Sequence, residues 1–184
     1  MKTRTAFTLI ELIIVLSILV ALSGLVLPLC SDNLSVATET ATRATLVEAR
    51  EAMLQYWHDT KFVALNGVTT VATEAQRFSL AWLFLNPVTN STAVQFDPNS
   101  RSGWNGPYMA VSTADSAALG GPNLIDGWNQ SLVVQYVNVG SNLKDVRIVS
   151  AGPNGIIDIP SSTATSALTT SSTGDDLYVA LMLR

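Results

Sequence analysis

The chain has 184 residues, which is enough for one modest domain in addition to an apolar N-terminal segment. Its formal net charge is -4, and no run of Lys or Arg follows the N-terminus, so the basic surface typical of nucleic-acid-binding proteins is missing. Cys30 is the only cysteine, which excludes an internal disulfide and a cysteine-cluster metal site.

Residues typical of catalytic sites are scarce. His58 is the only histidine, and it cannot join Cys30 as a nucleophile and base because Cys30 falls in the apolar segment. The sequence has no Gly-Lys-Ser/Thr phosphate loop and no zinc-ligand spacing. A Ser/Asp arrangement stays open, but we expect a protein that is not an enzyme.

The first predicted element is a membrane-spanning helix. From Leu12 to Ser31 no side chain is charged, and about 20 residues at roughly 1.5 Å each give a helix about 30 Å long, the thickness of a bilayer core. Lys2 and Arg4 precede this run, whereas the first charges after it are acidic. The positive-inside rule therefore predicts a cytoplasmic N-terminus and an exported remainder.

Glu11 lies immediately before this run. A carboxylate in the bilayer without a partner costs about 2.5 to 3.5 kcal/mol, so we expect a positive group to meet it. Three ordinary interpretations of the segment stay open: a secretory signal cut near Ala21 and Ser23, a lipoprotein signal at Cys30, and an uncleaved anchor. Bulky residues before Cys30 disfavour the lipoprotein signal, and none of the three explains Glu11.

The stretch AFTLIE, from Ala6 to Glu11, with the apolar run after it, resembles the class III signal of type IV pilins and of the pseudopilins of type II secretion systems. The resemblance implies that a prepilin peptidase removes a leader of residues 1–6, cutting between Ala6 and Phe7 and methylating the new amine. Glu11 then becomes the fifth mature residue. Its carboxylate would pair with the Phe7 amine of a neighbouring subunit in a growing filament. Ala6 stands where the family usually has Gly.

The pattern predicts one helix up to Thr60, with residues 7–31 as its transmembrane half and 32–60 as an amphipathic half that covers a head domain. Two apolar stripes run along the second half with a small shift of phase. They consist of Leu34, Ala37, Ala41 and Ala44, and of Leu46, Ala49, Met53 and Tyr56. A second short helix is predicted from Thr73 to Leu85, with Phe78, Trp82 and Leu85 on one face.

From Gly103 onward the pattern predicts short strands separated by turn residues. Four segments are rich in β-branched and aromatic residues: PYMAV at 107–111, SLVVQYVNV at 131–139, DVRIVSA at 145–151 and LYVALMLR at 177–184. A helix followed by strands predicts an α+β fold, in which the long N-terminal helix packs on a C-terminal antiparallel sheet of about three to four strands. Residues 61–184 would form the globular head.

Four segments of the head narrow the resemblance to the major, or G-type, pseudopilin. They are WNGPYM from Trp104, DGWNQSLVVQY from Asp126, SAGPNG from Ser150 and TGDDLYVAL from Thr173, similar in order and spacing. Asn129 stands where Gly is usual, and the stretch 156–173 is longer and richer in Ser and Thr than in that family. Two alternatives stay open: a type IV pilus subunit or minor pilin serving adhesion, motility or DNA uptake, and a membrane-anchored or secreted binding module.

Oxygen-bearing side chains gather in two loops at the end of the predicted sheet. Asp175 and Asp176 come just before the last strand, and Asn154 and Asp158 lie in the preceding loop. Calcium takes about six to eight oxygen ligands, so two converging loops suffice. The resemblance implies a calcium site here, with Asn154 where the family has Asp. The alternative is a turn residue accompanied by solvated loop acids.

The resemblance as a whole implies a structural subunit of a type II secretion pseudopilus. Such a subunit spans the bacterial inner membrane once, with a cytoplasmic N-terminus and a periplasmic head. It assembles with copies of itself and with other minor pseudopilins into a helical filament that drives protein export. Its further partners would be the prepilin peptidase and an inner-membrane assembly platform with a cytoplasmic ATPase.

Overall fold

The computed structural model describes residues 7–60, 78–86, 95–110, 114–115, 123–139 and 142–181, with the backbone alone at 25–33, 114–115, 138–139 and 142–144. The predicted leader 1–6, with Ala6, lies outside these residues. The chain divides into two compact units, Met1–Thr38 and Glu39–Arg184. Helix α1 (Leu9–Thr60) supplies residues to both units.

In the first unit, α1 begins with a reciprocal cap. The backbone N–H of Glu11 donates to Thr8 Oγ1 over 3.3 Å, and the backbone N–H of Thr8 donates to Glu11 Oε2 over 3.0 Å. This is the Ser/Thr-x-x-Glu capping box, which satisfies two donors that a helix start leaves free. The helix therefore begins at Leu9, two residues after Phe7, the first residue of the predicted mature chain.

The apolar side chains at the start of α1 are solvent-exposed. All large apolar side chains from Phe7 to Leu22 are more than half exposed. The hydroxyls of Ser17 and Ser23 donate to the carbonyls of Ile14 and Leu19, so these polar groups are satisfied within the helix. Within the residues that the structure describes, no helix combines the length and apolar character of a membrane span. The side chains of 25–33, part of the predicted transmembrane half, lie outside the description.

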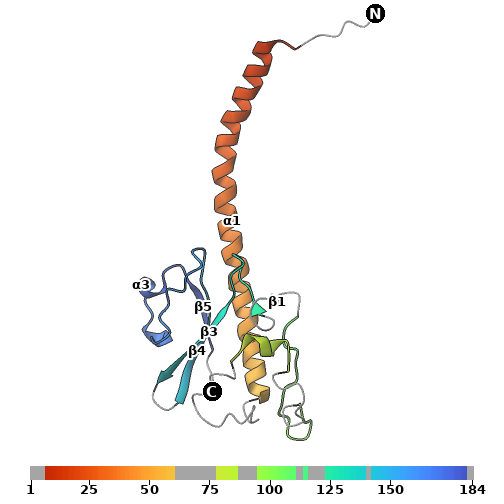
Figure 1. Ribbon diagram of the computed structural model, residues 1–184, viewed down its shortest axis with the longest axis vertical. Helices are drawn as coiled ribbons and strands as arrows, with labels where there is room; N and C mark the ends of the chain where they lie inside the picture. The colour runs from red at the N-terminus through yellow and green to blue at the C-terminus, as the bar shows by residue number, and fades with distance from the viewer. Residues whose placement is uncertain are drawn as a thin grey trace, which may run out of the picture. The chain divides into compact units, whose positions relative to one another are not determined.

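The second unit contains an antiparallel sheet of three strands in the order β3-β4-β5. Its strands are β3 (Val133–Val139), β4 (Asn142–Ser150) and β5 (Leu177–Leu181), and they lie beside the C-terminal part of α1 (Figure 1). Ile148 in the central strand is opposite Val134 on one side and Val179 on the other. The predicted α+β fold with a helix and an antiparallel sheet is confirmed.

One face of the sheet packs on α1. The second predicted stripe of the helix is buried as expected, and its side chains form a core with Val146, Ile148 and Leu181 of the sheet; the stripe consists of Leu46, Ala49, Met53 and Tyr56. Side chains spaced three and four residues apart share one helix face, which explains why the periodicity was sufficient to predict this contact. The residues of the first stripe are exposed.

The other face of the sheet is covered by the chain between β4 and β5. Gln135 and Arg147 lie opposite each other on this face, and both are buried. Arg147 donates to the carbonyl oxygens of Pro160 and Thr163, and Gln135 donates to that of Ile159. The Ser/Thr-rich stretch continues through the short helices η4 (Thr165–Ala167) and α3 (Thr170–Thr173). The chain from Ile159 to Thr165, called the covering segment below, therefore covers the face of the sheet that carries Arg147 and Gln135.

The helix predicted from Thr73 to Leu85 is wrong over the part that the structure describes, which begins at Phe78. Ser79 is extended, and only the single 3-10 turn η2 (Leu80–Leu83) follows. Pro87 has no N–H to donate to the Leu83 carbonyl, so this carbonyl instead accepts hydrogen bonds from Tyr108 and Met109. Leu85, predicted on a face with Phe78, is 54% exposed, whereas Phe78 is buried.

The strand predicted at 107–111 is also wrong over 107–110, and Val111 lies outside the described residues. Pro107 lacks an N–H, and the N–H groups of Tyr108 and Met109 both donate to the carbonyl of Leu83, so no strand ladder forms there. An antiparallel pair of two-residue strands that the sequence did not predict is formed by β1 (Ala114–Asp115) and β2 (Asn123–Leu124), and Leu124 belongs to the core.

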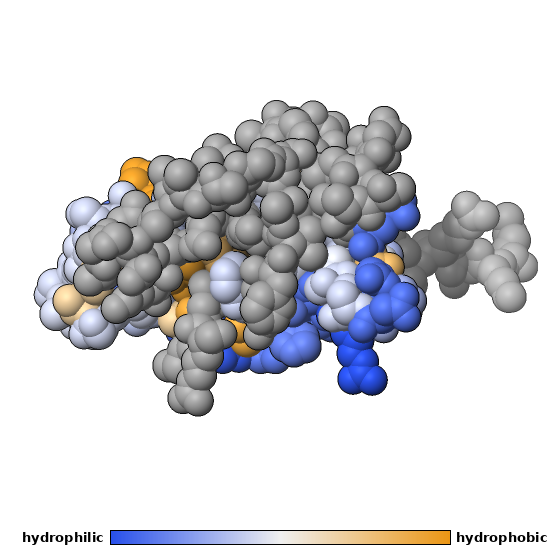
Figure 2. All heavy atoms as spheres, turned by 90° about the horizontal axis from the view of Figure 1, so that it is seen from below, coloured by the Kyte–Doolittle hydropathy of each residue, from blue (hydrophilic) through white to orange (hydrophobic). Residues whose placement is uncertain are grey.

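In the view of Figure 2, the surface of the described residues is mainly hydrophilic to neutral, with small hydrophobic patches.

Candidate functional site

The first candidate site is the start of α1. The Phe7 side chain is 80% exposed, and the Glu11 carboxylate accepts hydrogen bonds from the Thr8 backbone N–H and from Thr8 Oγ1, the latter over 2.9 Å. No Lys or Arg side chain pairs with Glu11 among residues 7–60 and the other described segments. The local role of Glu11 is therefore that of a helix cap, and its charge has no cationic partner within this part of the chain.

The second candidate site is formed by the loop after β4 and the loop before β5, which meet at two glycines. Gly152 has φ 60° and Gly174 has φ 55°, a region that side-chain-bearing residues rarely adopt. A Cβ at Gly152 would overlap the carbonyl oxygen of Asp175, and a Cβ at Gly174 would overlap the Asp158 carboxylate. The two loops thus approach each other more closely than any other residue type would allow.

Asn154 is the centre of this loop junction. Its side-chain Nδ2 donates to Asp175 Oδ1 over 2.6 Å and to Asp158 Oδ2 over 3.5 Å, and its backbone N–H donates to Asp175 Oδ2 over 3.1 Å. Its Oδ1 accepts the backbone N–H of Ile156 over 2.6 Å. Asn154 is therefore in direct contact with two of the other three predicted ligand residues, Asp158 and Asp175.

Asp176, the fourth predicted ligand residue, binds the backbone of the loop after β4. Its side chain is only 6% exposed, and its Oδ2 accepts the backbone N–H groups of Asp158 and Ile159 over 2.7 and 2.8 Å. Burial raises the pKa of Asp176, while these two N–H donors oppose the shift and the nearby carboxylates of Asp158 and Asp175 add to it. Its Oδ1 is buried and accepts no hydrogen bond from the residues described.

The four predicted ligand side chains all carry oxygen atoms, which calcium prefers. In this structure, however, hydrogen bonds join Asn154 to Asp158 and Asp175. The NH₂ group of Asn154 lies between the two carboxylates and donates to both. Among the described residues, no group of three or more His, Cys, Asp or Glu side chains is arranged to hold a metal ion. The calcium site stays a prediction.

A third polar centre, which the sequence did not single out as a site, joins α1 to the sheet. The buried Asp126 carboxylate accepts hydrogen bonds from the backbone of Trp128 and Gln130 and from the Ser150 hydroxyl, the last over 2.6 Å. The N–H of Gly127, in the same turn, donates to Thr42 Oγ1 on α1. The DGWN stretch carries the signal for this turn, since Asp accepts bonds from N–H groups two to four residues on.

Asn129 stands where the sequence resemblance led us to expect Gly, and its backbone conformation is one that Gly favours. Its φ is 64°, in the left-handed region where Gly is favoured and where Asn is the next most tolerant residue. Its backbone N–H donates to the Asp126 carbonyl over 3.1 Å and closes the turn. Asn therefore preserves the backbone conformation that Gly would provide.

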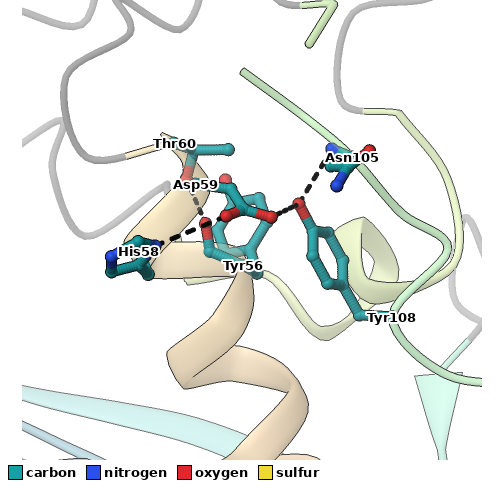
Figure 3. A network of polar contacts seen from close by, with 6 residues as sticks. All are labelled: Tyr56, His58, Asp59, Thr60, Asn105 and Tyr108. Carbon is teal, nitrogen blue, oxygen red and sulfur yellow. Dashed lines mark hydrogen bonds and ion pairs between the residues drawn. The ribbon is translucent and has the colours of Figure 1, made fainter. Parts of the chain in front are cut away.

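The last turn of α1 carries a further network (Figure 3). The Tyr108 hydroxyl donates to Asp59 Oδ2 over 3.1 Å and accepts the backbone N–H of Asn105 over 2.9 Å, while His58 Nδ1 lies 3.5 Å from Asp59 Oδ1. Burial is the main cause that raises the pKa of Tyr108, and the Asp59 charge adds to it against the Asn105 donor. The phenol is thus held protonated, so this network ties the helix end to 103–109 and offers no activated nucleophile.

Comparison with known proteins places the chain in no family: no family model, no curated protein and no solved structure matches it.

Proposed function

We propose that the protein is a structural subunit of a helical filament of the type IV pilin-like superfamily, most similar to the major pseudopilin of type II secretion systems. The observation that carries this proposal is the start of α1, where the AFTLIE signal opens an exposed apolar surface with Glu11 as its one carboxylate. The α+β architecture, with a long helix packed on an antiparallel sheet, supports it.

The apolar surface of α1 requires an apolar environment. Burying a Leu, Ile or Val side chain is worth about 1.5 to 3 kcal/mol, and the segment from Phe7 to Leu22 exposes many of them in succession. Before assembly, residues 7–31 anchor the subunit in the bacterial inner membrane. After assembly, the same surface packs against the helices of neighbouring copies along the filament axis.

Glu11 gives this packing a register. A carboxylate within an apolar filament axis is costly unless a positive group compensates it. Prepilin peptidase supplies one by cutting between Ala6 and Phe7, because the cut creates a new amine on Phe7. Pairing between this amine and Glu11 of a neighbour repeats one head-to-tail interface, which is what an open helical assembly requires.

The remaining partners follow from this role. An inner-membrane platform with a cytoplasmic ATPase moves processed subunits into the filament together with minor pseudopilins. The heads lie in the periplasm, and the growing filament drives folded proteins outward. No catalytic step by the subunit itself is involved.

The N-terminal peptide of the protein, purified from membranes of cells with and without a prepilin peptidase, tests this proposal. We expect a mature chain that begins at N-methylated Phe7 only when the peptidase is present. A chain cut near Ser23, or one that keeps residues 1–6 in both strains, would contradict the proposal because Glu11 would then have no neighbouring amine to meet.

A further inference from the structure

We propose that the Asn154 amide joins the loop after β4 to the loop before β5 in the position that a divalent cation would otherwise take, so that closure of these loops does not require calcium. The inference goes beyond the filament role and does not depend on it. It concerns what holds the end of the sheet together.

The surrounding groups fix the orientation of the Asn154 amide. Its oxygen and nitrogen ends differ only in that one accepts and the other donates hydrogen bonds. The Ile156 N–H can only donate, and it faces Oδ1 over 2.6 Å, whereas the carboxylates of Asp158 and Asp175 accept and face Nδ2. Turning the amide over would set two donors against each other at Ile156 and two acceptors against each other at Asp175.

This orientation removes Asn154 from the set of cation ligands. A cation would need Oδ1 directed between the carboxylates, but Oδ1 is bound to Ile156 on the other side. Asp176 Oδ2 is also committed, since it accepts two backbone N–H groups of the 158–159 segment, whereas its buried Oδ1 accepts no hydrogen bond from the described residues. Asp158 and Asp175 are the carboxylates that the amide contacts, and its NH₂ group donates to both of them where a cation would otherwise bind.

The amide also offsets the charge problem of the junction. Two carboxylates that approach one group repel each other unless a donor or a cation lies between them. The NH₂ group supplies a donor to each, and the backbone N–H of Asn154 adds another to Asp175. An Asp at this position would supply no side-chain donor and a third negative charge, so Asn154→Asp is expected to make closure depend on a cation.

The test compares the thermal unfolding of the full chain in calcium chloride and in a calcium chelator, with the same detergent throughout. Asn154→Asp is the key variant. Asn99→Asp is its matched control, because Asn99 is also an exposed loop residue that accompanies an aspartate, Asp97. A ligand that binds only the folded chain raises its Tm, so the calcium-dependent shift in Tm reports binding.

We expect the same Tm in calcium and in chelator for the natural chain and for Asn99→Asp. Asn154→Asp is expected to unfold at lower temperature in chelator and to recover several degrees in calcium. A calcium-dependent rise in the Tm of the natural chain overturns the proposal, and this measurement needs no variant. A variant Asn154→Asp that folds but ignores calcium also overturns it, because the amide would then occupy no cation position.

Discussion

Arg147 lies opposite Gln135 on neighbouring strands, and its Nε–H donates a hydrogen bond of 2.8 Å to Gln135 Oε1 beneath the covering segment. The Arg147 side chain is fully buried at 0% exposure, and its remaining bonds reach Pro160, Thr163 and Thr165. Burial lowers the pKa of Arg147, but the nearby Asp145 opposes this shift, and an arginine keeps its charge. Arg147 thus joins the sheet to the segment that covers it, together with Gln135, which donates to the Ile159 carbonyl.

Arg147→Met is expected to lower the free energy of unfolding by about 2 to 4 kcal/mol, because the carbonyls of Pro160 and Thr163 and the amide oxygen of the buried Gln135 lose their donors. Denaturant unfolding measures this loss. Arg43→Ala is the control, since Arg43 forms an exposed pair with Glu39 within one helix, worth about 0.5 kcal/mol or less. Equal effects of the two substitutions would show that the covering layer does not depend on Arg147.

Tyr108 is expected to make the stability pH-dependent in alkali. Its pKa is raised in the folded chain, so its contribution is complete below the unfolded value of about 10 and is lost as the pH rises toward the folded value. Titration by phenolate absorbance should show a late ionisation step to which Tyr108 contributes. Tyr108→Phe should remove this late step and cost about 1 kcal/mol, because the bonds to Asp59 and Asn105 are lost. An unchanged titration curve in Tyr108→Phe contradicts this assignment.

If the proposed function is right, Glu11→Ala should leave the subunit in the membrane and abolish filament formation, because the Phe7 amine of the next subunit would then have no carboxylate to meet. Electron microscopy of sheared filaments and the amount of membrane-retained subunit measure the two effects separately. Glu48→Ala is the matched control, since Glu48 is an exposed glutamate on the same helix. Normal filaments from Glu11→Ala would refute the role of this carboxylate in assembly.

Asn129 is expected to tolerate Gly but not Val. At φ 64°, a β-branched side chain costs about 1 to 3 kcal/mol, whereas Gly adopts this conformation freely. Thermal unfolding of Asn129→Gly and Asn129→Val should therefore differ by several degrees, with the glycine variant near the natural chain. If both variants lost the same stability, the Asn129 side chain rather than its backbone would be what the turn requires.

The α+β fold could be predicted because its main contact is periodic in the sequence. Leu46, Ala49, Met53 and Tyr56 repeat at helical spacing, and the three strands are β-branched runs bounded by turns. The helix wrongly predicted to end at Leu85 and the strand wrongly predicted at 107–111 have one cause. The Leu83 carbonyl accepts hydrogen bonds from the N–H groups of Tyr108 and Met109, and residues so far apart in the sequence leave no local pattern.

The candidate sites also contain features that the sequence could predict and features that it could not. The nearness of Asn154, Asp158 and Asp175 could be expected from the loops that the strands bring together, aided by the resemblance. The direction of the Asn154 amide could not, because it depends on the Ile156 N–H. The role of Arg147 could not be predicted from the sequence either. It donates to backbone carbonyls of Pro160 and Thr163, in a segment whose composition shows only that it is rich in Ser and Thr.

The covering segment over Arg147 and helix α1 each cover part of one face of the described sheet, while Tyr136, Val133 and Tyr178 stay exposed on it. Helix α1 occupies one side, and the chain from Ile159 to Thr165 occupies the other. In the proposed filament, contacts between neighbouring heads would therefore fall mainly on strand edges, loops and the outer surface of the covering segment. Under this proposal, sequence changes on the outer surface of that segment would alter the contacts between copies while the sheet beneath it keeps its packing.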